Sequence, residues 1–335
     1  MHRPTKRRSF AVAVALLLLV GVLTVTSLAV GARPTTPEVV WQALIDPTSM
    51  VGDHLVVRAR IARTVDALVV GAALGLAGGS MQGITRNPLA DPGILGVNAG
   101  AAAAIVTALA VFNIAGIAPL AIAGALGALG AFALVYAVAA AAPGGAQPMK
   151  LALVGAAINA GLFSVTSGWL LLSPAALERF RFWQVGVLGV RGLNELPATL
   201  WLLGAGLVLC LAGARPLNLM ALGDDAATAL GSRVQLARLA SALGCALLAG
   251  TSVALVGPIA FVGLVVPHVL RLFVGTNHRV LLPLCVVGGP VLLLAGDTIG
   301  RVIAPPGEIA VGVMTALVGA PVMIALVRGR GRVSL

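Results

Sequence analysis

The sequence predicts an all-α membrane protein of about ten transmembrane helices. Hydrophobic residues make up 59% of the 335 residues, charged residues make up 10%, and the mean hydropathy is +1.05. Apolar runs long enough to cross a bilayer, about 20 residues each, recur from end to end. The 42 glycines agree with this class, because glycine lets membrane helices approach one another closely. We therefore expect a single transmembrane domain over residues 1–335, with no room for a soluble domain.

The first helix is expected at residues 10–30, directly after a group of basic residues. A cleaved signal peptide is the competing interpretation, with small residues near 29–32 as the cleavage site. The apolar run is longer than the core of a signal peptide, which spans about 7–15 residues, so we expect an uncleaved helix. Its basic flank places the N-terminus in the cytoplasm.

Nine further apolar segments follow in order. They are expected at about 63–83, 93–112, 115–141, 151–172, 196–213, 239–256, a short one ending near 268–272, then 280–295 and 309–327. Polar segments at 31–64 and 173–195 are expected outside, and the second carries the aromatic and apolar residues of an interfacial helix: Phe180, Phe182, Trp183, Val185 and Val187. Ten spans place both termini in the cytoplasm. Lys and Arg are more frequent in the loops then expected inside, although the outside holds more of them than the rule predicts.

Charge and cysteine content exclude other classes. The net charge of +11 is explained by arginine-rich loops that face an anionic leaflet, so no nucleic-acid partner is expected. Cys210, Cys245 and Cys285 lie in apolar runs without metal-ligand spacing, and we expect them to be small buried residues. No metal and no cofactor is expected.

A compact island of charge and proline at residues 81–101 separates two long apolar runs. Proline fixes φ and removes a backbone donor, so the preceding helix must end near Pro88. Asp91 before Pro92 is typical of a helix N-cap with proline at the first helical position, which predicts a new helix from about residue 93. The alternative is an ordinary short loop. The predicted cytoplasmic turn motif comprises Arg86, Asn87, Pro88, Asp91 and Pro92.

The amino-acid sequence of this island, together with residues 71–78, 256–268 and 308–321, resembles that of the BtuC/FecCD-type permeases of ABC importers for vitamin B12, iron-siderophores and haem. The resemblance covers about residues 58–327. It implies an inner-membrane bundle with two opposed repeats, at about 63–172 and 239–327. It also implies an assembly with an ATPase dimer, a second permease copy or paralogue, and an extracytoplasmic substrate-binding protein. A ferric siderophore is the first expectation for the substrate, with haem and cobalamin next.

The loop at 214–238 is predicted to couple the bundle to the ATPase. Asp225-Ala226-Ala227, three residues and then Gly231 follow the spacing of the Glu-Ala-Ala-x3-Gly motif of ABC importer permeases, with Asp in place of Glu. Acidic residues in a first turn and a closing glycine suit a short helix. An ordinary amphipathic loop is the alternative. The predicted coupling residues are Leu222, Gly223, Asp224, Asp225, Ala226, Ala227 and Gly231.

Outer arginines are predicted to dock the binding protein. The resemblance matches Arg60, Arg63 and Arg301 to arginines that meet acidic residues of such a partner, although Ile61-Ala62 replaces the family's Leu-Pro. The excess of basic residues outside favours docking. The alternative is local ion pairing, of Arg63 with Asp66 and of Arg301 with Asp297.

The transport pathway is predicted from small and uncharged polar residues: Gly71, Gly75, Gly79, Asn159 and Ser164. For the glycines, tight helix packing is the alternative and the stronger interpretation. Apart from Asp66 near one helix end, no acid or base is expected near the middle of a span, which disfavours ion coupling. His268 is expected to have a structural role at a helix end.

The chain is not expected to be an enzyme. It contains no Gly-x4-Gly-Lys-Ser/Thr sequence, so a separate ATPase must supply the energy. The alternative function is a stand-alone secondary transporter or channel, which would need a coupling acid inside a span. An intramembrane hydrolase is weaker still, because the four histidines are scattered.

Overall fold

The computed structural model describes residues 6–31, 36–46, 52–93, 95–114, 116–143, 148–190, 193–304 and 307–328. All regular elements within these ranges are helical. In the first half they are α1 (Lys6–Ala29), α2 (Pro37–Ile45), α3 (Gly52–Thr85), α4 (Val97–Ala110), α5 (Ile117–Ala141), α6 (Pro148–Leu172) and α7 (Pro174–Trp183). In the second half they are η1 (Leu196–Thr199), α8 (Leu200–Ala212), α9 (Ala214–Met220), α10 (Asp224–Ala229), α11 (Val234–Val256), α12 (Val262–Val274), α13 (His278–Ile303) and α14 (Val311–Arg328).

The expected apolar segments form helices among the described residues, while the count of ten spans stays a prediction. Six helices are long and apolar enough to cross a membrane: α1, α3, α5, α6, α11 and α13. The segment from η1 to α9 bends by 42° and is long and apolar enough for a seventh span if the bent pair crosses as one, and α4, α12 and α14 are shorter apolar helices. The all-α polytopic fold class is confirmed. The division into two opposed repeats stays a prediction.

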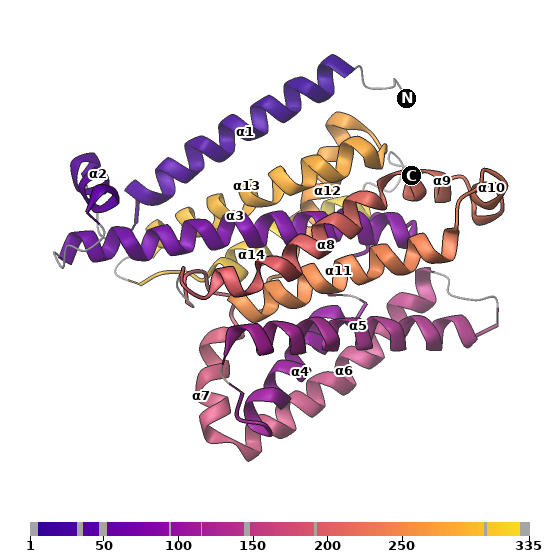
Figure 1. Cartoon of the computed structure of the whole chain (residues 1–335), viewed down its shortest axis with the longest axis horizontal. Helices are drawn as coiled ribbons and strands as arrows, with labels where there is room; N and C mark the ends of the chain where they lie inside the picture. The colour runs from indigo at the N-terminus through magenta and orange to yellow at the C-terminus, as the bar shows by residue number, and fades with distance from the viewer. Residues whose placement is uncertain are drawn as a thin grey trace.

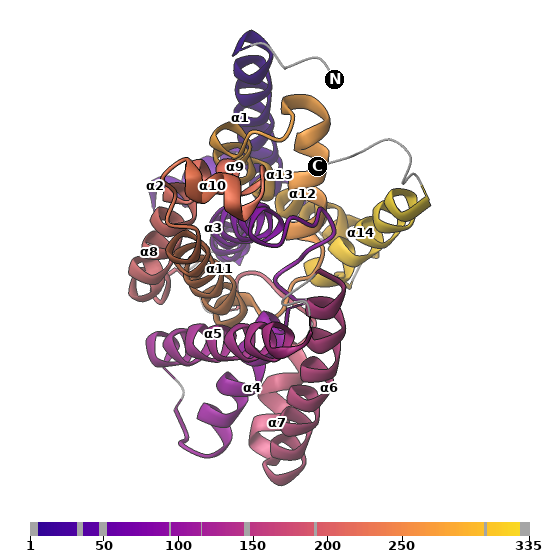
Figure 2. The ribbon, with the colours of Figure 1, turned by 90° about the vertical axis from the view of Figure 1, so that its right-hand side faces the viewer.

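Helix α3 runs through the middle of the bundle, with α13 and α12 on one side and α11 on another (Figures 1 and 2). Helix α11 separates α3 from α5, and α4 and α6 pack beyond α5. Helix α1 lies on the outside against α13, with most of its side chains exposed, as a lipid-facing helix should be.

The two ends of the bundle carry different elements. Helices α2 and α7, from the segments predicted to lie outside, are at one end in Figure 1, and α9 and α10, from the predicted inside loop, are at the other. The turn after α3 lies at the same end as α10, to which Arg86 is bonded. The predicted sidedness is thus consistent within the chain, while the location of both termini in the cytoplasm stays a prediction.

Close backbone contact between glycines fixes α3 against its neighbours. A Cβ atom on Gly289 of α13 would lie 1.8 Å from the carbonyl oxygen of Gly71, and one on Gly78 would lie 2.1 Å from the backbone of Gly263 in α12. Only residues without a side chain permit such an approach. Gly75 and Gly79 likewise face α13.

Several predicted boundaries are wrong, among them the end of α13, which lies at Ile303 and not near 295, and the start of α11, which lies at Val234 and not near 239. Helix α3 begins at Gly52 and not near 63, because residues 52–62 continue the same helix at the outer end. Helix α4 begins at Val97 and not near 93, and its N-cap is Gly96, with φ of 84°. The interfacial helix α7 begins at Pro174, where the side chain of Ser173 caps it, and ends before Val185 and Val187. The side chain of Phe182 lies outside the described part of the chain.

The break between α11 and α12 is closed by another segment. Gly257 (φ of 83°) ends α11, and Phe261 (φ of 69°) precedes α12. The N–H of Val187 donates to Val256 O at 3.0 Å, and the N–H of Gly312 donates to Gly186 O at 3.1 Å. Backbone groups exposed by a broken helix must find partners within the protein at membrane depth, and residues 184–190 supply them.

Candidate functional site

The loop predicted to couple the bundle to an ATPase forms two short helices at one end of the molecule. The chain bends by 42° after α8 into α9, and α10 follows from Gly223, whose φ is 110°. Helix α10 ends in a Schellman motif, in which Ser232 N donates to Ala227 O at 2.9 Å and Gly231 N donates to Thr228 O at 2.9 Å. Gly231 has φ of 80°, so glycine is required where the sequence predicted the helix end.

The two aspartates that begin α10 face different surroundings. The Asp224 carboxylate accepts hydrogen bonds from Arg86 and from Arg238 of α11, the second at 3.1 and 3.2 Å. Asp225 is exposed, as are Leu222 and Leu230 on either side of α10. The sequence singled out Asp225 by motif spacing, but it is Asp224 that ties α10 to the bundle.

A cavity lies behind this ion-pair network. It has a volume of about 440 Å³, and it lies between the ends of α3 and α5, the start of α6, α10 and α11. Eight residues line it: Ile84, Thr85, Arg86, Phe132, Tyr136, Leu151, Asp224 and Arg238. The three side chains of the Arg86–Asp224–Arg238 network therefore border a cavity and are not closely packed on that side.

The turn after α3 is held by side-chain bonds to its own backbone. Arg86 has φ of 50°, the Asn87 carboxamide oxygen accepts from Leu89 N at 3.0 Å, and the Asp91 carboxylate accepts from Gly93 N at 2.8 Å. Asp91 thus forms an Asx turn and is not the predicted N-cap of α4. Burial raises the pKa of the Asp91 carboxyl to about 6, against the opposing effect of the Gly93 N–H.

Two of the predicted docking arginines are buried and form their hydrogen bonds within the chain. Arg60 and Arg301 are only 5% and 1% exposed. Arg60 donates to the carbonyl oxygens of Leu28 and Ala29, both at 3.1 Å, and Arg301 donates to those of Ser27 and Val30, at 2.9 and 3.1 Å. The carbonyls that end α1 lack partners within that helix, so two guanidinium groups cap it and complement its dipole.

Arg63 lies beside them and is more accessible, with 16% of its side chain exposed. It pairs with Asp297 at 2.7 Å and with Glu308, while Arg301 pairs with Asp297 at 3.0 Å. The alternative pairing of Arg301 with Asp297 is therefore confirmed. The alternative pairing of Arg63 with Asp66 is wrong, because Asp66 accepts from the N–H of Gly189 at 2.8 Å.

The predicted pathway residues do not come together. Gly71, Gly75 and Gly79 are buried against α13, as the packing interpretation predicts. Asn159 of α6 donates to Gly93 O at 3.1 Å, and Ser164 is exposed and bonds to Ala160 O within its own helix. Only Asn159 and Ser164 remain candidates for contact with a transported molecule.

A buried polar network between α3 and α12 was missed. Arg271 is buried and donates to the side chain of Gln82, which in turn donates to Gly263 O at 3.0 Å. Arg271 lies at the end of the short apolar segment expected to finish near 268–272, where the sequence alone does not indicate that it is buried. The signal that could have found it is Gln82, a polar residue within a long apolar helix.

Fold and site together define a polytopic α-helical membrane protein whose loop helices at one end connect to its central helix. The FecCD transport family model matches residues 17–329. The chain therefore belongs to the FecCD transport family, and the family resemblance inferred from the sequence is confirmed.

Relatives match over nearly the whole chain. The ferric enterobactin transport system permease protein FepD of Escherichia coli (strain K12) is 44% identical over 95% of each chain. The probable siderophore transport system permease protein YfiZ of Bacillus subtilis (strain 168) is 38% identical over 90% of this chain and 91% of the relative. The hemin transport system permease protein HmuU of Yersinia pestis is 35% identical over 93% of each.

A solved structure has the same fold. It is described as an inward-facing conformation of a metal-chelate type ABC transporter, and it superposes with a TM-score of 0.80 at 29% identity. The superposition covers 96% of this chain and 99% of that chain. The fold is therefore that of an ABC transporter permease.

Proposed function

We propose that the chain is the permease subunit of an ABC importer that carries a ferric siderophore across the inner membrane, with haem and cobalamin as further candidates. The observation that carries this proposal is the match to permeases named for ferric enterobactin and siderophore transport over 90% or more of this chain. Both termini and the α9–α10 end would lie in the cytoplasm, in agreement with the basic N-terminal flank.

The proposed partners are an ATPase dimer, a second permease copy or paralogue, and an extracytoplasmic substrate-binding protein. The ATPase would contact α10 through its exposed groups, Leu222, Asp225 and Leu230. The binding protein would dock at the opposite end, near α2 and α7, where Arg63 is the predicted docking residue with part of its surface still free. The partly buried Asn159 and the exposed Ser164 of α6 would border the pathway.

The proposed coupling route runs through Asp224. When α10 moves with the ATPase, the bonds of Asp224 to Arg86 and Arg238 would carry the movement to the ends of α3 and α11. Exposed ion pairs contribute about 0.2–1 kcal/mol each, so their loss would weaken this link without unfolding the bundle.

A first experiment tests the assembly. The tagged chain is purified from its host under iron limitation, and the proteins that accompany it are identified by mass spectrometry. We expect an ATPase with a P-loop and a siderophore-binding protein. Recovery of the chain alone, with transport in liposomes in the absence of ATP, would instead establish a secondary transporter.

A second experiment tests the coupling route with matched variants, Asp224→Asn and Asp225→Lys. The first is expected to keep ATPase association but to lower the substrate transported per ATP hydrolysed, because the link to the bundle is weakened. The second is expected to weaken ATPase association itself. Unchanged transport in both variants, and after deletion of residues 224–227, would show that α10 does not couple the subunits.

A further inference from the structure

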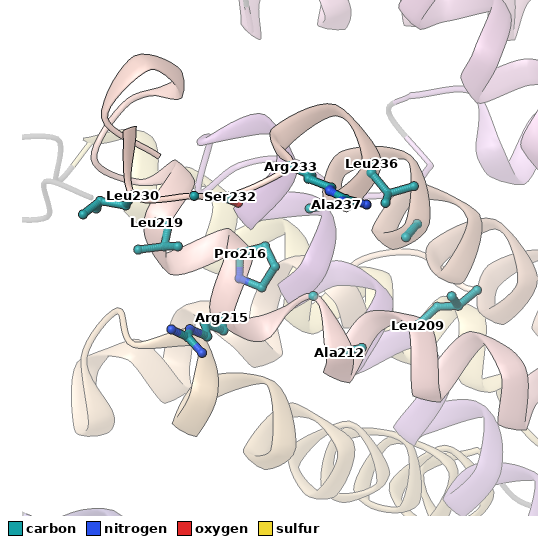
Figure 3. A pocket seen from close by; sticks show the side chains of 13 residues that line it. Leu209, Ala212, Arg215, Pro216, Leu219, Leu230, Ser232, Arg233, Leu236 and Ala237 are labelled. Carbon is teal, nitrogen blue, oxygen red and sulfur yellow. The ribbon is translucent and has the colours of Figure 1, made fainter. Parts of the chain in front are cut away.

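A second pocket opens at the end of the bundle where α8, α9 and α11 meet (Figure 3). Its volume is about 470 Å³, within the range of about 300–1,000 Å³ that is usual for small-molecule sites. Its walls are largely apolar, with Leu209 on α8, Pro216 and Leu219 on α9, and Leu236 and Ala237 on α11. It is distinct from the cavity behind Asp224.

The pocket exists because two tightly packed helices part. A Cβ atom on Gly213, at the end of α8, would lie 2.3 Å from the hydroxyl oxygen of Ser241 on α11, so the helices touch there. Directly beyond Gly213 the chain bends by 42° into α9 and leaves α11. The space between the diverging helices is the pocket.

Two arginines border this pocket without an acidic partner. Arg215 on α9 and Arg233 before α11 are both exposed, and their side chains lie on opposite sides of Pro216 (Figure 3). None of the described residues that line the pocket is acidic, and neither arginine forms an ion pair with another described residue. The site thus combines net positive charge with an apolar interior.

The pocket is continuous with an exposed apolar surface of α8 and α11. Val208 on α8 and Leu239 on α11 are more than 60% exposed, and Leu236, itself exposed, belongs both to this surface and to the pocket wall. On membrane-spanning helices such apolar residues contact acyl chains. A molecule that enters the pocket from the bilayer would meet apolar walls first and the two guanidinium groups at the membrane–water boundary.

We propose that this pocket binds an anionic phospholipid, with its phosphate at Arg215 or Arg233 and its acyl chains along α8 and α11. Basic pockets between membrane helices suit anionic headgroups, and arginine donates to phosphate with good geometry. Leu230 and Gly231, at the end of α10, also line the pocket, so the bound lipid would support the base of this helix.

The experiment measures phosphatidylglycerol binding to the purified full-length chain by native mass spectrometry, with phosphatidylcholine as the neutral comparison. The test variant is R215Q/R233Q, and the matched control is R279Q, an exposed arginine outside the pocket at the start of α13. A third variant, A237W, fills the pocket but keeps both arginines. Inaccessibility of the three buried cysteines to a thiol dye verifies that each variant is folded.

We expect wild type and R279Q to prefer phosphatidylglycerol equally. Each arginine near an anionic headgroup raises the affinity by slightly more than about fivefold. R215Q/R233Q should therefore bind phosphatidylglycerol about 30-fold more weakly. A237W should also bind weakly, because the lipid must enter the pocket. Equal binding of both lipids by wild type, or an equal loss in R279Q and the double variant, would overturn the proposal.

The competing occupant is the ATPase subunit. If R215Q/R233Q keeps its affinity for phosphatidylglycerol but no longer recovers the ATPase on purification, the pocket belongs to the protein interface and the lipid proposal fails. This outcome would leave the proposed importer function intact, so the two conclusions are tested separately.

Discussion

Replacement of Arg301 by glutamine tests whether this residue holds α1 or docks a partner. Its guanidinium lies 3.0 Å from the Asp297 carboxylate and donates to the carbonyl oxygens of Ser27 and Val30, and to the Ser27 hydroxyl at 2.8 Å. Glutamine has too few donors and too short a side chain to replace these bonds. The carbonyl oxygens at the end of α1 would lose the hydrogen bonds from Arg301 and keep those from Arg60. Among the described residues, Asp297 would keep Arg63 as its ion-pair partner.

The expected loss of stability follows from this environment. Removing one partner from a buried ion pair costs about 3–5 kcal/mol, and we take the lower value because Arg63 still neutralises Asp297. With an unfolding entropy of about 2 cal/mol/K per residue, a loss of about 3 kcal/mol lowers the melting temperature by about 4 °C for a chain of this length.

The assay uses the thiols that the chain already has. Cys210, Cys245 and Cys285 are free and buried, so a dye that fluoresces on reaction with thiols reports unfolding in detergent. R301Q should have a lower melting temperature than wild type, while R279Q should have the same melting temperature as wild type. Unchanged melting of R301Q together with lost recovery of the substrate-binding protein would refute the structural role and restore the docking prediction.

Two further predictions concern packing and pH. Gly289→Val should prevent folding or cost about 3 kcal/mol, because its side chain would meet the backbone of Gly71, whereas Gly130→Val, with open space around its Cβ, should melt with wild type in the same assay. Asp91 has a folded pKa of about 6 against 3.8 for the ordinary carboxyl, so its protonated form stabilises the protein fully below about pH 4, and this contribution is lost as the pH rises through about 6. This contribution is at most about 3 kcal/mol, so Asp91→Asn should reduce the loss of stability between about pH 4 and about pH 8 by up to that amount; an identical pH profile for both proteins would contradict the pKa assignment.

Local sequence signals were accurate where the local chain decides the structure. The break at Gly257 and the end of α10 at Gly231 both occur at glycines with positive φ, a conformation that other residues rarely adopt. The apolar runs located the six long membrane-spanning helices, because hydrophobic length is a property of the segment itself. The start of α4 was misplaced, since the Asp91 side chain bonded to Gly93 and formed a turn where a cap was expected.

The outer arginines show the limit of such signals. Their excess outside was interpreted as a docking surface, yet Arg60 and Arg301 cap the end of α1 from helices α3 and α13. Sequence separation from Ser27 is 274 residues for Arg301, so no local pattern could indicate the contact. Charge counts register that a cation is present but not whether its partner is a separate protein or a distant carbonyl.

The sequence by itself determined the class of protein, the all-α polytopic fold and the family, because composition, hydrophobic length and short motifs are all properties of the chain read in order. Only the tertiary structure decided that Asp224 and not Asp225 is bonded to the bundle, that two outer arginines are internal caps, and that α8, α9 and α11 enclose a basic pocket. The physical reason is the same in each case. These features are bonds and spaces between helices remote in sequence, and packing alone decides which side chains meet.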